Sequence, residues 1–162
     1  MTTEPSSVSR VLGEDHRDLD GLWAELEATP AHDPLARRER FDRFRSGLLV
    51  HIAVEEEYLF PILEAADPTG RALVARLLEE HAGIRHILDR FDRELAGGVD
   101  SLKTEGFELA NALGEHNARE ENLAYPWFDD HLTPAQMLEA KDRLRRHDQR
   151  GGTDNQVRRS DG

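Results

Sequence analysis

Apolar residues recur at steps of three and four along most of the chain, which is the spacing of one face of an α-helix. Four such stretches follow one another, and their apolar faces contain Leu12, Phe41, Leu77 and Leu109. No stretch shows the sustained alternation of apolar and polar residues that a half-buried strand requires. The pattern therefore predicts an all-α protein.

Turn signals divide these stretches into separate helices. Asp33-Pro34 and Asp67-Pro68 each have the form of an N-cap followed by proline in the first helical turn, and Gly97-Gly98 ends the third stretch. A fourth helix is expected to begin near Asp100, and a shorter fifth at Thr133-Pro134. Residues 1–147 are predicted to form an up-down-up-down antiparallel four-helix bundle plus this short C-terminal fifth helix. Residues 148–162 are polar, and we expect a disordered tail there.

The chain matches itself at an offset of 65 residues. The matched positions with functional side chains or proline are His16 with His81, His51 with His116, Glu55 with Glu120, Glu56 with Glu121, and Pro61 with Pro126. Shared amphipathicity explains matching leucines, but it does not explain matching histidines and glutamates at interior positions. We expect two copies of one helical hairpin that cover each other's apolar faces, with a kink at each matched proline.

Each copy contains a His-x-x-x-Glu motif, HIAVE at 51–55 and HNARE at 116–120. Residues four apart lie on one helix face, so each motif presents an imidazole beside a carboxylate. The turn positions place both motifs level with His16 and His81 in the bundle interior. Four imidazoles and two carboxylates buried together are costly without a partner, and metal ions provide one.

Composition narrows the chemistry of this site and the choice of partners. The chain has 162 residues, eight histidines, no cysteine and a formal net charge of −12. Nitrogen and oxygen ligands without sulfur suit iron, manganese or zinc, and two carboxylates able to bridge favour a pair of ions. So acidic a chain lacks the basic surface that nucleic acid or an anionic membrane requires. No apolar run is long enough to cross a membrane and no secretory signal is visible, so we expect a cytoplasmic protein.

The order His … His-x-x-x-Glu … His … His-x-x-x-Glu, with EEEYLFP and EENLAYP after the two motifs, resembles the hemerythrin-like (HHE cation-binding) domain over about residues 8–130. The resemblance implies two iron ions per chain, bridged by oxo or hydroxo, in a four-helix bundle that binds O2, NO or peroxide. It implies these metal ligands: His16, His51, His81 and His116 as terminal ligands, and Glu55 and Glu120 as bridging carboxylates.

The sequence departs from the oxygen-carrying members of that family in two places. Their third helix contains His-x-x-x-His, whereas Arg85 stands four residues after His81 here; their last helix contains His-x-x-x-x-Asp, whereas this chain has His-x-x-x-Glu. A ferritin-like bundle would need Glu-x-x-His on two helices, and no histidine of this chain has glutamate three residues before it. We therefore set the ferritin-like alternative aside.

Several further residues are weaker candidates for the site. Asp20, the repeat mate of Arg85, is either a ligand or a partner of Arg85, and His86 reaches the site only if a π-bulge turns it inward. Glu56 and Glu121 are expected around the ligands or on the surface. We expect these aromatic residues in the core and the pocket lining: Tyr58, Tyr125, Trp23 and Trp127. A tyrosine ligand stays open as an alternative, although no spacing supports one.

Three functions of different class follow from these observations. The first is a di-iron protein that binds or reacts with O2, NO or peroxide, and whether it turns over as an enzyme stays open. The second is an iron- or oxygen-responsive sensor that a protein partner recognises. The third, a bundle without metal, leaves the buried His and Glu residues unexplained. The sequence identifies neither a redox partner nor an oligomeric state.

Overall fold

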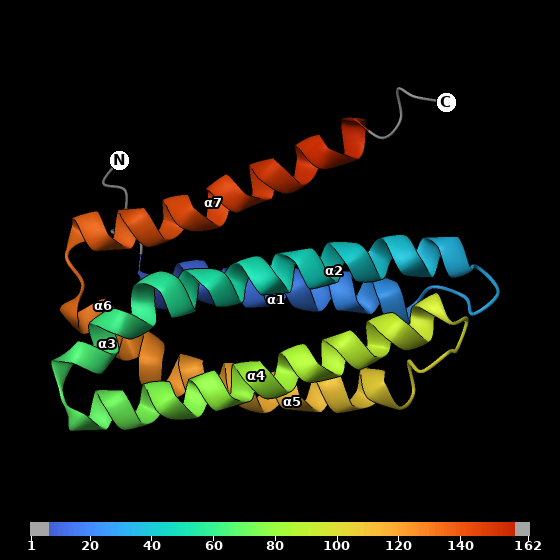
Figure 1. Cartoon of the computed structure of the whole chain (residues 1–162). Helices are drawn as coiled ribbons and strands as arrows, with labels where there is room; N and C mark the ends of the chain where they lie inside the picture. Colours follow the sequence, from blue (N-terminus) through green and yellow to red (C-terminus); the bar gives the residue numbers. More distant parts are fainter. Residues whose placement is uncertain (1–6, 158–162) are drawn as a thin grey trace.

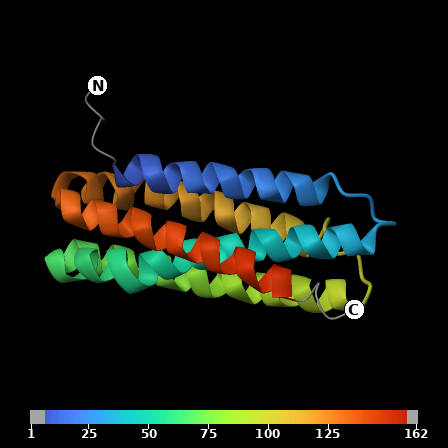
Figure 2. The same ribbon diagram turned by 90° about the horizontal axis from the view of Figure 1, so that it is seen from above.

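The computed structural model describes the backbone of residues 7–157 and the side chains of residues 7–146, and this part of the chain is helical without strands. Four long helices lie side by side in antiparallel order (Figures 1 and 2): α1 (Val8–Glu27), α2 (Pro34–Val54), α4 (Pro68–Ala96) and α5 (Glu105–Arg119). The predicted four-helix bundle is confirmed. No helix of the described residues is both long and apolar enough to span a membrane.

The helix ends follow the predicted turn chemistry. The side chain of Asp33 accepts a hydrogen bond from the backbone N–H of Ala36, and Asp67 accepts one from Gly70, so both aspartates cap the helices that follow them. Gly98 has φ +77°, a conformation that costs glycine little and ends α4 as expected. The fourth long helix begins at Glu105, a few residues later than predicted.

A π-helical turn interrupts both motif-bearing helices next to the matched prolines. Helix α2 continues through η1 (Glu55–Leu59) into α3 (Phe60–Ala66), and α5 continues through η2 (Glu120–Ala124) into α6 (Tyr125–His131). The backbone N–H of Phe60 bonds the carbonyl of Glu55, and that of Tyr125 bonds the carbonyl of Glu120, five residues back. Proline has no N–H and its ring collides with a carbonyl in the preceding turn, so a wider turn before it relieves the conflict.

Two apolar clusters lie along the bundle, on either side of a polar layer. One contains Phe60, Tyr125 and Phe128, and the other contains Trp23, Phe41 and Phe91. A Cβ on Gly70 would lie 2.4 Å from the carbonyl oxygen of Leu63, so glycine allows α3 and α4 to meet closely at the proline-containing end. These clusters fix the positions of the helices and therefore the positions of the polar side chains between them.

Helix α7 (Pro134–Val157) lies against α2 outside the four-helix core, as the predicted fifth helix (Figure 1). Its buried contacts come from Ala140, which joins the cluster around Phe60. Helix α7 extends ten residues past the predicted end of the domain at residue 147. The backbone of residues 148–157 is therefore helical, whereas the sequence predicted a disordered tail there. Residues 158–162 lie outside the described residues, and the domain boundary at 147 stays a prediction.

Candidate metal centre

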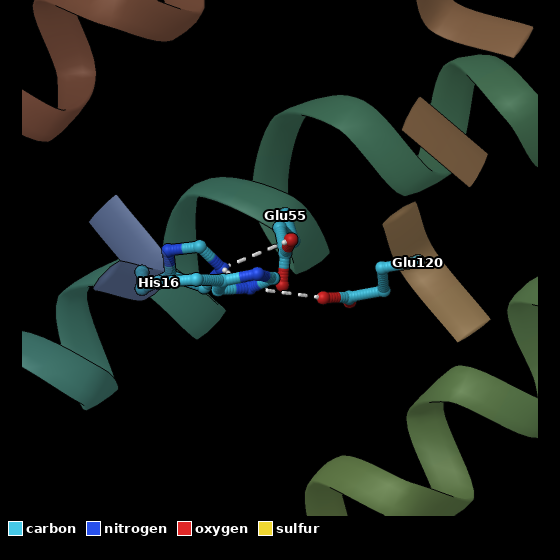
Figure 3. Close-up of side chains that lie close together, drawn as sticks. His16, Glu55 and Glu120 are labelled. Carbon is cyan, nitrogen blue, oxygen red and sulfur yellow. Dashed lines mark hydrogen bonds and ion pairs between the residues drawn. The ribbon is translucent and has the colours of Figure 1, made fainter. Parts of the chain in front are cut away.

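The six residues predicted as ligands meet in the polar layer of the bundle. They form two groups, one of His16, His51, Glu55 and Glu120, the other of Glu55, His81, His116 and Glu120. Within each group one ligand atom from every residue lies within 4.8 Å of the others. Figure 3 shows Glu55 and Glu120 facing His16 from different helices. All six side chains are buried, and both glutamates are fully buried.

Each glutamate directs one oxygen toward each histidine pair. In the N-terminal half of the centre, defined by His16 and His51, the two Nε2 atoms lie 3.1 Å apart. Glu55 Oε1 lies 3.2 Å from His51 Nε2, and Glu120 Oε2 lies 3.4 Å from His16 Nε2.

The C-terminal half, defined by His81 and His116, repeats this arrangement with the opposite oxygens. Its Nε2 atoms lie 3.0 Å apart, Glu55 Oε2 lies 3.4 Å from His81, and Glu120 Oε1 lies 2.9 Å from His116. Metal bonds of about 2.1 Å at right angles place neighbouring ligand atoms about 3 Å apart, which matches these distances. The two carboxylates therefore lie between the two histidine pairs, where they could bridge a pair of cations.

A second set of carboxylates contacts the Nδ1 atom of each of the four histidines in the ligand groups. The four Nδ1 contacts are His51 with Asp15 at 2.6 Å, His81 with Glu56 at 2.9 Å, His116 with Glu80 at 3.0 Å and His16 with Glu121 at 2.8 Å. A carboxylate only accepts, so each Nδ1 donates its proton, and a neutral imidazole then directs the lone pair of Nε2 toward the interior. This arrangement orients a histidine for metal binding and raises its basicity.

These four contacts form a closed ring around the bundle. Helix α1 provides the carboxylate for the histidine of α2, η1 for that of α4, α4 for that of α5, and η2 for that of α1. Each carboxylate therefore ties its own helix to the next one. The ring fixes all four imidazoles by contacts between helices, so the site and the bundle stabilise each other.

The hydroxyl of Tyr125 lies at the middle of the N-terminal half. Its Oη donates to Glu55 Oε1 at 2.7 Å and lies 3.0 Å from Glu120 Oε2. The same atom is 3.1 Å from His16 Nε2 and 3.3 Å from His51 Nε2. Tyr125 is fully buried, and one phenol thus contacts all four ligand atoms of this half.

The protonation of the metal-free centre reflects this crowding of charge. Burial lowers the pKa of His81, but the nearby carboxylates of Glu120 and Glu55 outweigh it and raise that pKa to about 9. Burial also raises the pKa of Glu120, but the nearby imidazoles of His116, His16 and His81 bring it well below its usual value. Burial and the nearby charge of Glu55 raise the pKa of Tyr125 well above its usual value. Without a cation, protons on the histidines balance the two carboxylates.

Two carboxylate oxygens lack the hydrogen bonds that buried oxygens normally accept. Glu55 Oε2 lies 3.4 Å from His81 Nε2 and Glu120 Oε1 lies 2.9 Å from His116 Nε2, but among the described residues neither oxygen has a contact with hydrogen-bond geometry, and both are buried. Both belong to the C-terminal half, where no hydroxyl corresponds to that of Tyr125. A buried acceptor without a partner is expensive, and a bound cation removes that cost. The residues present therefore fit a cation site.

The weaker candidates lie outside both groups. Asp20 and His86 are exposed, and neither belongs to a ligand group among the described residues. The π-turns occur in η1 and η2, whereas α4 stays regular around His86. Arg85 pairs with neither Asp20 nor the interior: its guanidinium binds both oxygens of Glu56, each at 2.8 Å.

Sequence reasoning missed three contributors to the site. Asp15 and Glu80 stand one residue before His16 and His81 and match each other at the 65-residue offset, so the repeat contained a signal for them. Tyr125 stands five residues after Glu120, about 140° away on a regular α-helix. The π-turn η2 closes that difference, which is why a regular helix did not place the hydroxyl in the site.

Comparisons with known proteins agree with this geometry. The family model described as the hemerythrin HHE cation-binding domain matches residues 7–128. A DNA nickase of Nostoc sp. (strain PCC 7120 / SAG 25.82 / UTEX 2576) is 22% identical over 130 residues, which cover 80% of this chain and 36% of the nickase. The chain thus spans about a third of that relative's length. No solved structure matches the chain significantly.

Proposed function

The chain belongs to the hemerythrin HHE cation-binding domain family, and from that premise we propose that it is a di-iron protein that reacts with O2, NO or peroxide. The proposal depends above all on one observation, the pair of four-residue groups that share both Glu55 and Glu120. One ion would lie between His16 and His51 and the other between His81 and His116, with both carboxylates common to the two.

The ligand set allows iron, manganese or zinc, and the resemblance to the hemerythrin-like domain selects iron among them. Imidazole and carboxylate ligands without thiolate suit iron. Bound iron provides the one-electron and oxygen chemistry that protein side chains lack. The protein residues fix both halves, exclude bulk water from the buried layer and hold the imidazole protons on the Nδ1 atoms.

Reaction is favoured over reversible oxygen carriage by the residue at position 85. Arg85 is half-exposed and bound to Glu56. It therefore provides no ligand at the position where the oxygen-carrying members of the family have a histidine. The C-terminal half therefore has one protein nitrogen fewer. We expect the reduced protein to oxidise rapidly in air and to react with peroxide or NO in preference to holding O2.

Metal analysis and stopped-flow mixing test this function. Two irons per chain and near-ultraviolet charge-transfer bands are expected for the purified protein, one ion for each ligand group. Reduced protein mixed with air-saturated buffer should oxidise without a long-lived adduct. A stable adduct that returns to the reduced state when O2 is removed would restore the carrier function, and Arg85→His should lengthen the adduct lifetime.

The nickase relative does not extend this proposal to DNA. The match leaves about two thirds of that protein uncovered, and its printed activity belongs to the whole protein. The net charge of −12 opposes association with a polyanion. We therefore propose a small-molecule ligand and no nucleic acid, and retention on a DNA column at physiological salt would contradict this.

A further inference from the structure

The two halves of the centre differ at the residue that follows each π-turn. Tyr125 follows η2, and its hydroxyl contacts all four ligand atoms of the N-terminal half. Its repeat mate Phe60 follows η1 and stacks on His81, with ring centroids 5.5 Å apart and an interplanar angle of 18°. Phenylalanine has no donor or acceptor atom. The same backbone device thus fills one half with an oxygen and leaves the other without one.

The unpartnered oxygens lie on the side that lacks the hydroxyl. Tyr125 Oη contacts Glu55 Oε1 and Glu120 Oε2. The other oxygens, Glu55 Oε2 and Glu120 Oε1, are buried and face only imidazole nitrogens, and among the described residues none of these contacts has hydrogen-bond geometry. This observation is independent of Phe60, because it concerns the carboxylates and not the ring. Unmet hydrogen-bonding capacity therefore occurs in the half that lacks the hydroxyl.

The outer carboxylates of the two halves also differ in their charge balance. In the C-terminal half, Arg85 binds Glu56 at 2.8 Å, and Arg119 and Arg76 each bind Glu80 at 2.9 Å. In the N-terminal half, Asp15 and Glu121 contact only their histidines among the ion pairs of the described residues. A carboxylate neutralised by guanidinium attracts an imidazole proton less strongly, so its histidine is a weaker metal donor. The histidines of the C-terminal half are therefore the weaker electron donors to a bound metal.

We propose that an external small anion binds at the His81–His116 half, while Tyr125 occupies the corresponding position of the His16–His51 half. This inference depends on the proposed metal function and deepens it by locating the open position. An ion with weaker protein donors and fewer of them is the stronger Lewis acid and the better anion site. Arg85 and Arg119 add positive potential on that side without touching the ligand, so they are positioning residues.

A reciprocal exchange of the two aromatic residues tests the proposal. Azide is the probe, titrated into oxidised, iron-loaded protein and followed by its charge-transfer absorption. Phe60→Tyr should abolish azide binding, because the new hydroxyl reaches Glu55 Oε2 and Glu120 Oε1 as Tyr125 reaches their other oxygens. Tyr125→Phe should keep or increase azide binding and should remove a visible tyrosinate-to-iron band. Tyr58→Phe, at a half-buried tyrosine outside both ligand groups, is the matched control and should match the wild type.

The opposite result would overturn the proposal. If Tyr125→Phe loses azide binding while Phe60→Tyr keeps it, the open position lies in the N-terminal half. Iron content is measured for every variant, since loss of iron from the wild-type protein would contradict the proposed metal function itself, whereas two irons with azide on the wrong side contradict only this inference.

A second pair of variants tests the charge asymmetry without entering the buried layer. Arg85→Gln should weaken azide binding by about tenfold, the lower end of effects seen when groups around metal ligands are changed. Asp20→Arg places a guanidinium at the repeat mate of Arg85, where it can bind Glu121, and should leave the azide affinity of the open half unchanged while shifting the tyrosinate band. Arg45→Gln, which breaks only a surface pair with Asp89, is the control. An unchanged affinity in Arg85→Gln would contradict the role of that arginine.

Discussion

The two hairpins of this protein match at the residues of the two ligand groups and of the ring around them, and they differ at two residues beside those groups, at positions 60/125 and 20/85. The matched pairs are His16 with His81, His51 with His116, Glu55 with Glu120, Asp15 with Glu80, and Glu56 with Glu121. All ten side chains take part in the ligand groups or in the ring around them. A repeat of this kind fixes a symmetric frame, within which a few unmatched residues produce unequal halves.

Two of the unmatched pairs lie beside the ligands. Tyr125 corresponds to Phe60, and Arg85 corresponds to Asp20. Both exchanges act in the same direction. Tyr125 adds an oxygen to the N-terminal half, whereas Phe60 offers the C-terminal half none. Arg85 adds positive charge to the C-terminal half, whereas Asp20 leaves negative charge on the N-terminal half. Mutations at matched positions should therefore affect metal content, and mutations at unmatched positions should affect reactivity.

The largest effect is expected where the frame itself is broken. His51→Ala or His116→Ala should each lower the iron content and destabilise the fold, since the remaining carboxylates then face each other in the core. Binding of a ligand at a thousand times its Kd stabilises the fold by about 4 kcal/mol, so loss of the metal should lower Tm by about 10 °C in a chain of this size. Iron per chain and Tm are the measurements. Full iron with an unchanged Tm in both variants would remove the site.

The next effect separates the bridging carboxylates from the ring. Glu55→Gln and Glu120→Gln should lower metal affinity more than Glu56→Gln and Glu121→Gln, because an amide cannot bridge two cations but can still accept from an imidazole N–H. Loss in the second pair is expected to be about tenfold, the lower end for groups that orient a ligand. Competition with a chelator measures the affinity. Equal loss in all four variants would mean that the ring is as important as the bridges.

Most of the frame was predictable from the sequence, since helical periodicity and the repeat act over long stretches. The aspartate caps, the bundle and the six ligand candidates all follow from spacing on regular helices. The hydroxyl of Tyr125 did not follow, because its position depends on one π-turn that shifts the phase of the helix. The partner of Arg85 did not follow either. The sequence suggested Asp20, whereas the contact with Glu56 depends on how two helices pack.

The stability of the metal-free protein should depend on pH differently from that of the metal-loaded protein. The histidine His81 faces Glu55 at 3.4 Å, Glu120 at 3.7 Å and Glu56 at 2.9 Å, with His116 beside it, and its pKa is raised to about 9. A raised histidine pKa contributes stability that is fully present below the unfolded value of about 6.5 and is lost as pH rises through the folded value. Tm of chelator-treated protein should therefore fall between pH 6.5 and about 9.

Cations replace these protons in the loaded protein, so its Tm should stay nearly flat over the same range and metal binding should release protons. Proton release is measurable by calorimetry in buffers of different ionisation enthalpy. Parallel pH curves for the metal-free and loaded proteins would show that the histidines do not exchange protons for metal.

The smallest expected effect compares two members of the ring. Asp15→Asn and Glu80→Gln both leave an oxygen that accepts from the histidine Nδ1, but they differ in what they release. Glu80 also binds Arg76 and Arg119, whereas Asp15 contacts only His51 among the described ion pairs. Neutralising Glu80 therefore leaves two guanidinium groups beside His116 and lowers its donor strength further, while neutralising Asp15 removes the whole charge that His51 experiences. We expect metal affinity to fall by about tenfold in both variants, but azide to bind more tightly only in Glu80→Gln, because only that change makes the open half more electropositive. Equal azide affinity in the two variants would indicate that the two halves respond as one centre.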